Sequence, residues 1–158
     1  MAGWHPDCYQ RAVAYVTDPA GRLLVFDHLD ADAGTQVPGG GIQFGETAEQ
    51  AVLRELAEES GLATAVVVRK LGEAWHRSEP GAVPAGLEEQ VQHVFHLALP
   101  HPPDHERWEW EERSGGDVVQ HRFAFRWIAL DDAVAVLQPH RAMSMWIDAV
   151  RLSVQHPA

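Results

Sequence analysis

The sequence has 158 residues, of which 46% are hydrophobic, which is enough for one domain with a substantial core. The formal net charge of -11 disfavours tight binding to long nucleic acid or to an anionic membrane, because each phosphate contact would need a lysine or arginine. The single cysteine, Cys8, excludes an intrachain disulfide, and no apolar run approaches membrane-spanning length. We therefore expect a single domain over residues 1–158 in a cytoplasmic protein, without a membrane or long nucleic acid among its partners.

A β-hairpin is predicted near the start of the chain. Residues 11–16 and 23–26 are strand candidates, and the turn formers Asp18-Pro19-Ala20-Gly21 lie between them. The acidic segment 27–36 that follows is interpreted as a solvated loop. It leads to Gly39, Gly40 and Gly41, where a glycine-rich turn would let a ligand approach the backbone closely. These three glycines are predicted to bind substrate.

A helix is predicted from Thr47 to Ser60, because the segment has no proline or internal glycine and ends at Gly61. At about 100° per residue, Glu55, Glu58 and Glu59 share an arc of roughly 100° on one face. Like charges one turn apart repel each other, and a hard divalent cation removes that cost. We therefore predict that the three carboxylates bind Mg²⁺ or Mn²⁺, with phosphates of a substrate completing the coordination.

The span from Gly40 to Leu62 resembles the Nudix box, G-x5-E-x7-R-E-U-x-E-E-x-G-U, where U is aliphatic. Its fixed positions are filled by Gly40, Glu46, Arg54, Glu55, Leu56, Glu58, Glu59, Gly61 and Leu62. A chance match is rarer than about one in a million, since each of seven invariant residues is expected at about 5 to 10%. A merely solvated acidic helix face would not carry the glycines and the arginine at these offsets.

This resemblance implies a divalent-metal-dependent pyrophosphohydrolase that cleaves a diphosphate linkage in a nucleoside diphosphate joined to another group. Its predicted catalytic residues are Glu55, Glu58, Glu59 and Arg54, with the glutamates holding the metal and Arg54 orienting them. One of the glutamates, or a loop glutamate, would activate water, while Glu46 braces the loop and Gly61 ends the helix. Nucleoside triphosphates, dinucleoside polyphosphates and ADP-ribose-like compounds all stay open as substrates.

Two further implications of the resemblance stay open. The alternative to an enzyme is a non-catalytic regulatory domain that keeps the fold and senses a nucleotide, although the chain has lost no box glutamate. Relatives in this family are frequently homodimers, and the sequence neither requires nor excludes one. In either case the expected partner is a small nucleotide or nucleotide derivative.

After the box, residues 63–68 form a β-branched run that predicts a buried strand, and residues 90–99 alternate as a second strand. The ten histidines of the chain form no tight ligand motif, so none is assigned to a metal. Residues 121–130 alternate with one aromatic face and predict a strand. A short helix ending at Leu137 and a second helical segment follow. The apolar positions of that second segment predict a core stripe, made of Met143, Trp146, Ile147, Val150 and Val154.

The segment from Pro100 to Gly116 has prolines at its start and glycines at its end, and a loop this long in a compact domain is usually functional or disordered. Members of the Nudix family often supply one more acidic residue from a loop before the last strand, so Glu111 and Glu112 are candidate metal ligands. Trp108 or Trp110 could stack on a nucleobase, which is worth roughly 1 to 3 kcal/mol per base. The alternative for these tryptophans is packing on the sheet or covering a subunit contact.

Strands on both sides of the box helix, followed by a terminal helix, predict an α+β fold, an α/β/α sandwich with a mixed β-sheet. This agrees with the Nudix fold that the resemblance implies, with its box loop and helix and a C-terminal helix.

Overall fold

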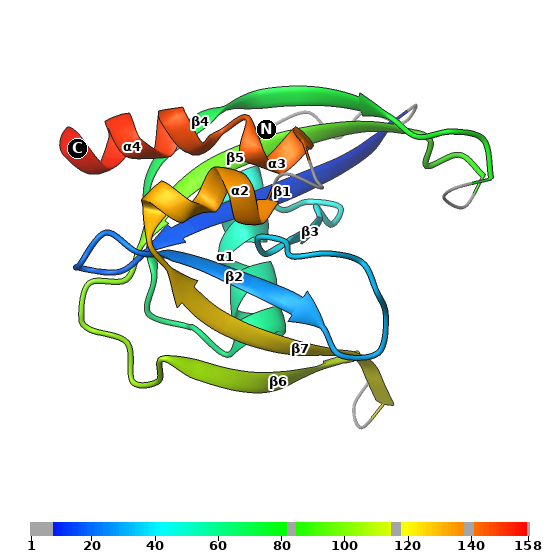
Figure 1. Cartoon of the computed structure of the whole chain (residues 1–158). Helices are drawn as coiled ribbons and strands as arrows, with labels where there is room; N and C mark the ends of the chain where they lie inside the picture. Colours follow the sequence, from blue (N-terminus) through cyan, green and yellow to red (C-terminus); the bar gives the residue numbers. More distant parts are fainter. Residues whose placement is uncertain (1–7, 82–84, 115–117, 138–140, 158) are drawn as a thin grey trace.

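A mixed β-sheet forms the centre of the molecule in the computed structural model, which describes residues 8–81, 85–114, 118–137 and 141–157 (Figure 1). The strands of this part of the chain are β1 (Tyr9–Thr17), β2 (Leu23–His28), β3 (Gly39–Gly41), β4 (Val66–Arg77), β5 (Glu89–Ala98), β6 (Arg107–Ser114) and β7 (Val118–Ile128). Their order is β4-β5-β1-β2-β7-β6, and the short β3 also pairs with β1. The β1–β5 pair is parallel, whereas the other named pairs are antiparallel, so the sheet is mixed as predicted.

Helices cover both faces of this sheet (Figure 1). The box helix is α1 (Ala48–Ser60), and the C-terminal part forms η1 (Leu130–Asp132), α2 (Ala133–Leu137), α3 (Arg141–Ser144) and α4 (Ile147–Gln155). Buried residues of α1 belong to one hydrophobic cluster, and buried residues of α2 and α4 belong to another. The predicted α/β/α sandwich is therefore confirmed. None of the helices in the described residues has the length and apolarity that a membrane crossing requires.

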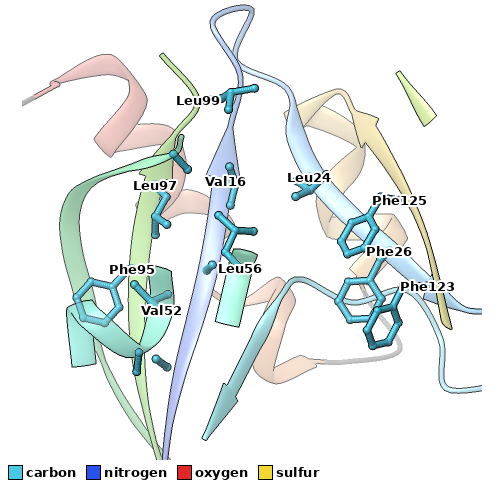
Figure 2. Packing of buried hydrophobic residues seen from close by; sticks show 14 of the residues in the cluster. Val16, Leu24, Phe26, Val52, Leu56, Phe95, Leu97, Leu99, Phe123 and Phe125 are labelled. Carbon is cyan, nitrogen blue, oxygen red and sulfur yellow. The ribbon is translucent and has the colours of Figure 1, made fainter. Parts of the chain in front are cut away.

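The central strand β1 separates the two cores because its side chains alternate between the faces of the sheet. Ala12, Ala14 and Val16 pack in the cluster with α1, whereas Val13 and Tyr15 pack in the cluster with α2 and α4. Figure 2 shows the first of these clusters from close by, with residues of the sheet and of α1 facing one another. The glycine strand β3 pairs with this buried strand, which places β3 beside both the sheet and α1.

Two predictions about the strands are wrong. The segment after the box was predicted to be a buried strand, but every residue of β4 is half-buried or exposed, because β4 is an edge strand of the sheet. The long loop predicted between Pro100 and Gly116 contains β6, which pairs with β7 from Arg107 to Ser114. The hairpin, the box helix and the core stripe of the C-terminal segment are confirmed.

Candidate active site

The box helix begins and ends at the residues that local chemistry favours. Thr47 is the N-cap: its Oγ1 accepts from the amide of Gln50 at 3.1 Å, and the side chain of Gln50 accepts from the amide of Thr47 at 2.9 Å. This reciprocal pair satisfies two helix amides that have no partner within the helix. Gly61 closes the other end with a φ of 80°, a left-handed conformation that glycine adopts without strain. The glutamates between these caps are therefore held on a well-defined helix.

Three carboxylates gather beside this helix. Glu55 and Glu58 of α1 and Glu112 of β6 each offer an oxygen, and these oxygens all lie within 4.8 Å of one another. Glu55 is buried, Glu112 is half-buried and Glu58 is exposed, so the group opens toward solvent on one side. Glu59, predicted as a third ligand on the same arc, lies outside this group. Its carboxylate accepts a hydrogen bond from the amide of Gly39 at 3.2 Å.

Arg54 forms hydrogen bonds to several residues of this acidic site. Its guanidinium donates to Glu46 at 2.6 and 3.1 Å, to Glu55 at 2.8 Å and to Glu58 at 3.1 Å. A further bond reaches the carbonyl of Gly41 in β3, at 2.9 Å. One arginine therefore joins the glycine strand, the loop after it and two carboxylates of the cluster, as a planar five-donor group can.

The glycine strand fits closely against Glu55. A Cβ atom on Gly40 would overlap the Glu55 carboxylate, and one on Gly39 would lie 2.7 Å from the carbonyl oxygen of Ala12. A side chain at Gly39 would meet the backbone of β1, and one at Gly40 would displace the Glu55 carboxylate. The predicted importance of these glycines thus has a steric reason in the packing of Glu55.

Burial and mutual repulsion shape the ionisation of the carboxylates. Burial raises the pKa of Glu55 above its usual value, and the hydrogen bond from Arg54 opposes that rise. Burial raises the pKa of Glu59 further, well above its ordinary range, and the negative charges of Glu55 and Glu112 add to this shift. In contrast, the hydrogen bond from Arg54 lowers the pKa of Glu46. Glu55 and Glu59 are carboxylates whose ionised forms would be favoured by a nearby cation.

A pocket of about 330 Å³ lies over the glycine strand. Its acidic side is formed by Glu55, Glu59 and Glu112, and other lining residues are Tyr9, Arg11, Phe26, His28, Gln36, Val37, Gly39, Gly40, Gly41, His121 and Phe123. Among these lining residues, all within the described part of the chain, Arg11 is the only lysine or arginine. The imidazoles of His28 and His121 lie near each other, with ring centroids 6.1 Å apart at right angles.

Sequence reasoning did not single out Arg11, His28 or His121 as residues of the site. All three lie outside the box and reach the pocket through strand pairing. Arg11 lies opposite Gly41, His28 lies opposite Phe123, and His121 lies opposite Glu112. One signal was present in the sequence, since Arg11 is the only charged residue in the segment that forms β1.

Of the two glutamates proposed from the segment before β7, the structure brings only Glu112 into the cluster. Side chains alternate along a strand, so Glu112 faces α1 together with Trp108 and Trp110, while Glu111 points to the opposite face. There Glu111 forms ion pairs with Arg113 at 2.5 Å and with Arg122 at 3.7 Å.

The two tryptophans of β6 lie against the C-terminal end of α1 rather than in the acidic pocket. The ring of Trp108 stacks on Phe125, with centroids 5.2 Å apart and an interplanar angle of 13°. Its indole Nε1 donates to the carbonyl of Ser60, and that of Trp110 donates to the carbonyl of Glu58, both at 2.9 Å. Both rings line a second pocket of about 330 Å³ beyond Gly61. This placement agrees with the packing alternative for Trp108.

Comparison with known proteins places these features in a family. The family profile described as the NUDIX domain matches residues 9–147. An RNA pyrophosphohydrolase of Azorhizobium caulinodans is 31% identical over 133 residues, covering 76% of this chain and 73% of that protein. Another RNA pyrophosphohydrolase, from the Wolbachia of Brugia malayi, is 44% identical over 50 residues. That match covers 32% of this chain and only 31% of the length of that relative.

Solved structures share the fold. The dihydroneopterin triphosphate pyrophosphohydrolase of E. coli superimposes with a TM-score of 0.67 at 20% identity, covering 89% of this chain and 92% of that one. An Ap4A hydrolase of C. elegans superimposes with a TM-score of 0.65 at 16% identity, covering 93% and 98%. At these identities the likeness establishes a common architecture, which agrees with the sandwich described above.

Proposed function

The chain belongs to the Nudix family, and from this premise we propose that it is a divalent-metal-dependent pyrophosphohydrolase. In this proposal it cleaves a diphosphate linkage in a nucleoside diphosphate joined to another group. The observation that carries the proposal is the meeting of Glu55 and Glu58 with Glu112, which comes from a distant strand. Three carboxylates brought together from two elements repel one another, and a bound divalent cation would offset this repulsion.

The donor set fits a hard divalent cation. Carboxylate oxygens are the ligands that Mg²⁺ and Mn²⁺ prefer, and oxygens within 4.8 Å of one another can share one ion. We assign the metal to Glu55, Glu58 and Glu112, as Mg²⁺ or Mn²⁺. When bound, such an ion neutralises charge on the phosphates and lowers the pKa of a coordinated water.

The remaining box residues have distinct parts in this proposal. Arg54 donates hydrogen bonds to both Glu55 and Glu58, so it fixes the directions of two of the three proposed metal ligands before substrate arrives. Glu59 lines the same pocket, held by the amide of Gly39. We assign Glu59 to accept the proton of the attacking water, since its carboxylate lines the pocket beside the proposed metal ligands, where a bound cation would favour its ionised form.

Three other residues that line the pocket, Arg11, His28 and His121, are proposed to bind phosphates of the substrate. Arg11 supplies the positive charge, and His28 and His121 supply imidazole nitrogens that can donate to phosphate oxygens. These residues take the place of a phosphate-binding lysine or arginine in the acidic segment after β2, which has neither between Asp27 and Gln36. The proposed substrate is therefore a small phosphorylated compound that fits a pocket lined by both acidic and basic side chains.

The comparisons agree on the kind of bond and differ on the group attached to it. One relative is named for RNA, one solved structure for dihydroneopterin triphosphate and another for Ap4A. We therefore propose the bond and the nucleotide-like character of the substrate for this chain, and leave the attached group to experiment.

The test is product release across a panel of nucleoside triphosphates, dinucleoside polyphosphates, nucleotide sugars and ADP-ribose, each with Mg²⁺, with Mn²⁺ and with chelator. The proposal expects metal-dependent cleavage of at least one class at a diphosphate bond. Cleavage that persists in chelator would contradict the metal assignment. If protein shown to be folded and to bind Mn²⁺ released no product from any compound of the panel, the result would instead favour a domain that binds nucleotides without turnover.

A further inference from the structure

Glu112 reaches the carboxylate cluster from a strand that is supported on one side only. Within the described part of the chain, β6 is an edge strand of the sheet and pairs with β7 alone (Figure 1). The regular register of this pair is interrupted between Glu112 and Arg113, immediately after the glutamate. The pairing with β7 is regular as far as Glu112, so a further constraint on how its carboxylate meets α1 has to come from contacts between β6 and the helix.

A hydrogen bond from Trp110 of β6 to the end of α1 supplies such a contact. The carbonyls of the last helical turn lack partners within the helix. The amide of Leu62, which would continue the helical pattern to the carbonyl of Glu58, donates instead to Ser60 Oγ at 3.1 Å. The indole of Trp110 donates to this carbonyl of Glu58 at 2.9 Å. The residue that contributes a carboxylate to the cluster is thus also the one whose backbone is bound by Trp110.

The position of Trp110 suits this task because it lies two residues before Glu112 on the same face of β6. Two residues of a strand span about 7 Å, so a fixed Trp110 sets the height of Glu112 along the helix. The ring packs so closely on Gly61 that a Cβ atom there would lie 2.7 Å from it. Gly61 of the box therefore both ends the helix and makes room for the indole.

We propose that Trp110 is a positioning residue of the metal site, which holds Glu112 opposite Glu58 through its bond to the Glu58 carbonyl. This inference rests on the proposed metal-dependent function. It gives Trp110 a different part from that of Trp108, which makes the same type of bond to Ser60, a residue without a carboxylate. Trp108 stacks on Phe125 and packs against the core, whereas Trp110 is 40% exposed.

The experiment compares Trp110→Phe with Trp108→Phe, each of which keeps an aromatic ring and removes the indole N–H. Mn²⁺ affinity is measured by electron paramagnetic resonance without substrate, and stability by urea unfolding of the metal-free protein. Removing the support of a metal ligand weakens metal binding by about 10-fold or more, which is the loss expected for Trp110→Phe. Trp108→Phe is expected to lower stability more than Trp110→Phe while changing Mn²⁺ affinity less.

A double variant separates this inference from the proposed function. If Trp110 acts through Glu112, then Glu112→Gln combined with Trp110→Phe binds Mn²⁺ no more weakly than Glu112→Gln alone. Unchanged Mn²⁺ affinity in Trp110→Phe, or additive losses in the double variant, would overturn the positioning role. Unchanged affinity in Glu112→Gln itself would instead contradict the metal assignment on which the inference rests.

Discussion

Replacing Arg54 with lysine tests how the acidic site is held together, because this change keeps the positive charge and removes the planar fork. Arg54 makes five hydrogen bonds, to Glu46, Glu55, Glu58 and Gly41. A lysine has three donors, so at least two of these bonds must be lost. At about 1.5 kcal/mol or more for each bond to a charged group, the free energy of unfolding should fall by about 3 kcal/mol.

The assay is urea unfolding of metal-free protein, followed by Mn²⁺ titration of the folded variant. The side chain of Arg54 is only 22% exposed, so solvent screens these bonds weakly. Arg77→Lys is the matched control: the Arg77 side chain is 79% exposed and pairs with Glu89 at 3.3 Å, so its replacement should cost less than about 0.5 kcal/mol. If Arg54→Lys cost no more than this control and left Mn²⁺ affinity unchanged, the bracing role of Arg54 would be refuted.

Three further predictions concern single carboxylates and a buried histidine. Glu112→Gln should lower turnover by about 100-fold through weaker metal binding, whereas Glu111→Gln on the other face of β6 should change it less than about twofold; equal effects would place the ligand elsewhere. Burial raises the pKa of Glu59 above the 4.5 of a free carboxyl. The folded protein therefore loses stability as pH rises from the pKa of the unfolded chain through the raised pKa of folded Glu59. Glu59→Gln should stabilise metal-free protein at pH 8 more than at pH 4; urea unfolding showing no gain at pH 8 would contradict this. Burial, with the charge of Arg69, lowers the pKa of His96 to about 4. Stability should then fall by about 3 kcal/mol as pH drops from about 6.5 to about 4, and the slope should flatten in His96→Gln; an equally steep slope in that variant would assign the loss to other groups.

The box helix could be predicted from the sequence because its signals are local. Thr47 and Gly61 fix its ends, and the positions of Glu55 and Glu58 on one arc follow from helical periodicity alone. The same periodicity put Glu59 on that arc, but it could not show that the Glu59 carboxylate is bound by the amide of Gly39. That contact depends on how β3 packs against the helix.

The segment that supplies Glu112 could not be predicted correctly, since its flanking prolines and glycines were taken as signs of a long loop. The alternation of Trp108, Trp110 and Glu112 was present in the sequence and is typical of a strand with one buried face. Interpreted in this way, it would have separated Glu112 from Glu111, which the structure places on opposite faces.

Arg11 and His121 reach the pocket through strand pairing that a single sequence does not reveal. Arg11 meets the glycine strand only because β1 pairs with β3, and His121 meets Glu112 only because β7 pairs with β6. The β4 segment shows the same limit in another form. Its β-branched composition indicated a buried strand, but its place at the edge of the sheet, set by strand order, leaves it half-exposed.

The central claim is that the carboxylates of α1 and β6 together bind one divalent metal at the head of the pocket. The most direct measurement is anomalous diffraction from a crystal of the protein soaked in Mn²⁺. The account predicts a manganese peak bonded to carboxylate oxygens of Glu55, Glu58 and Glu112. Manganese bound elsewhere, with these three side chains uncoordinated, would contradict it.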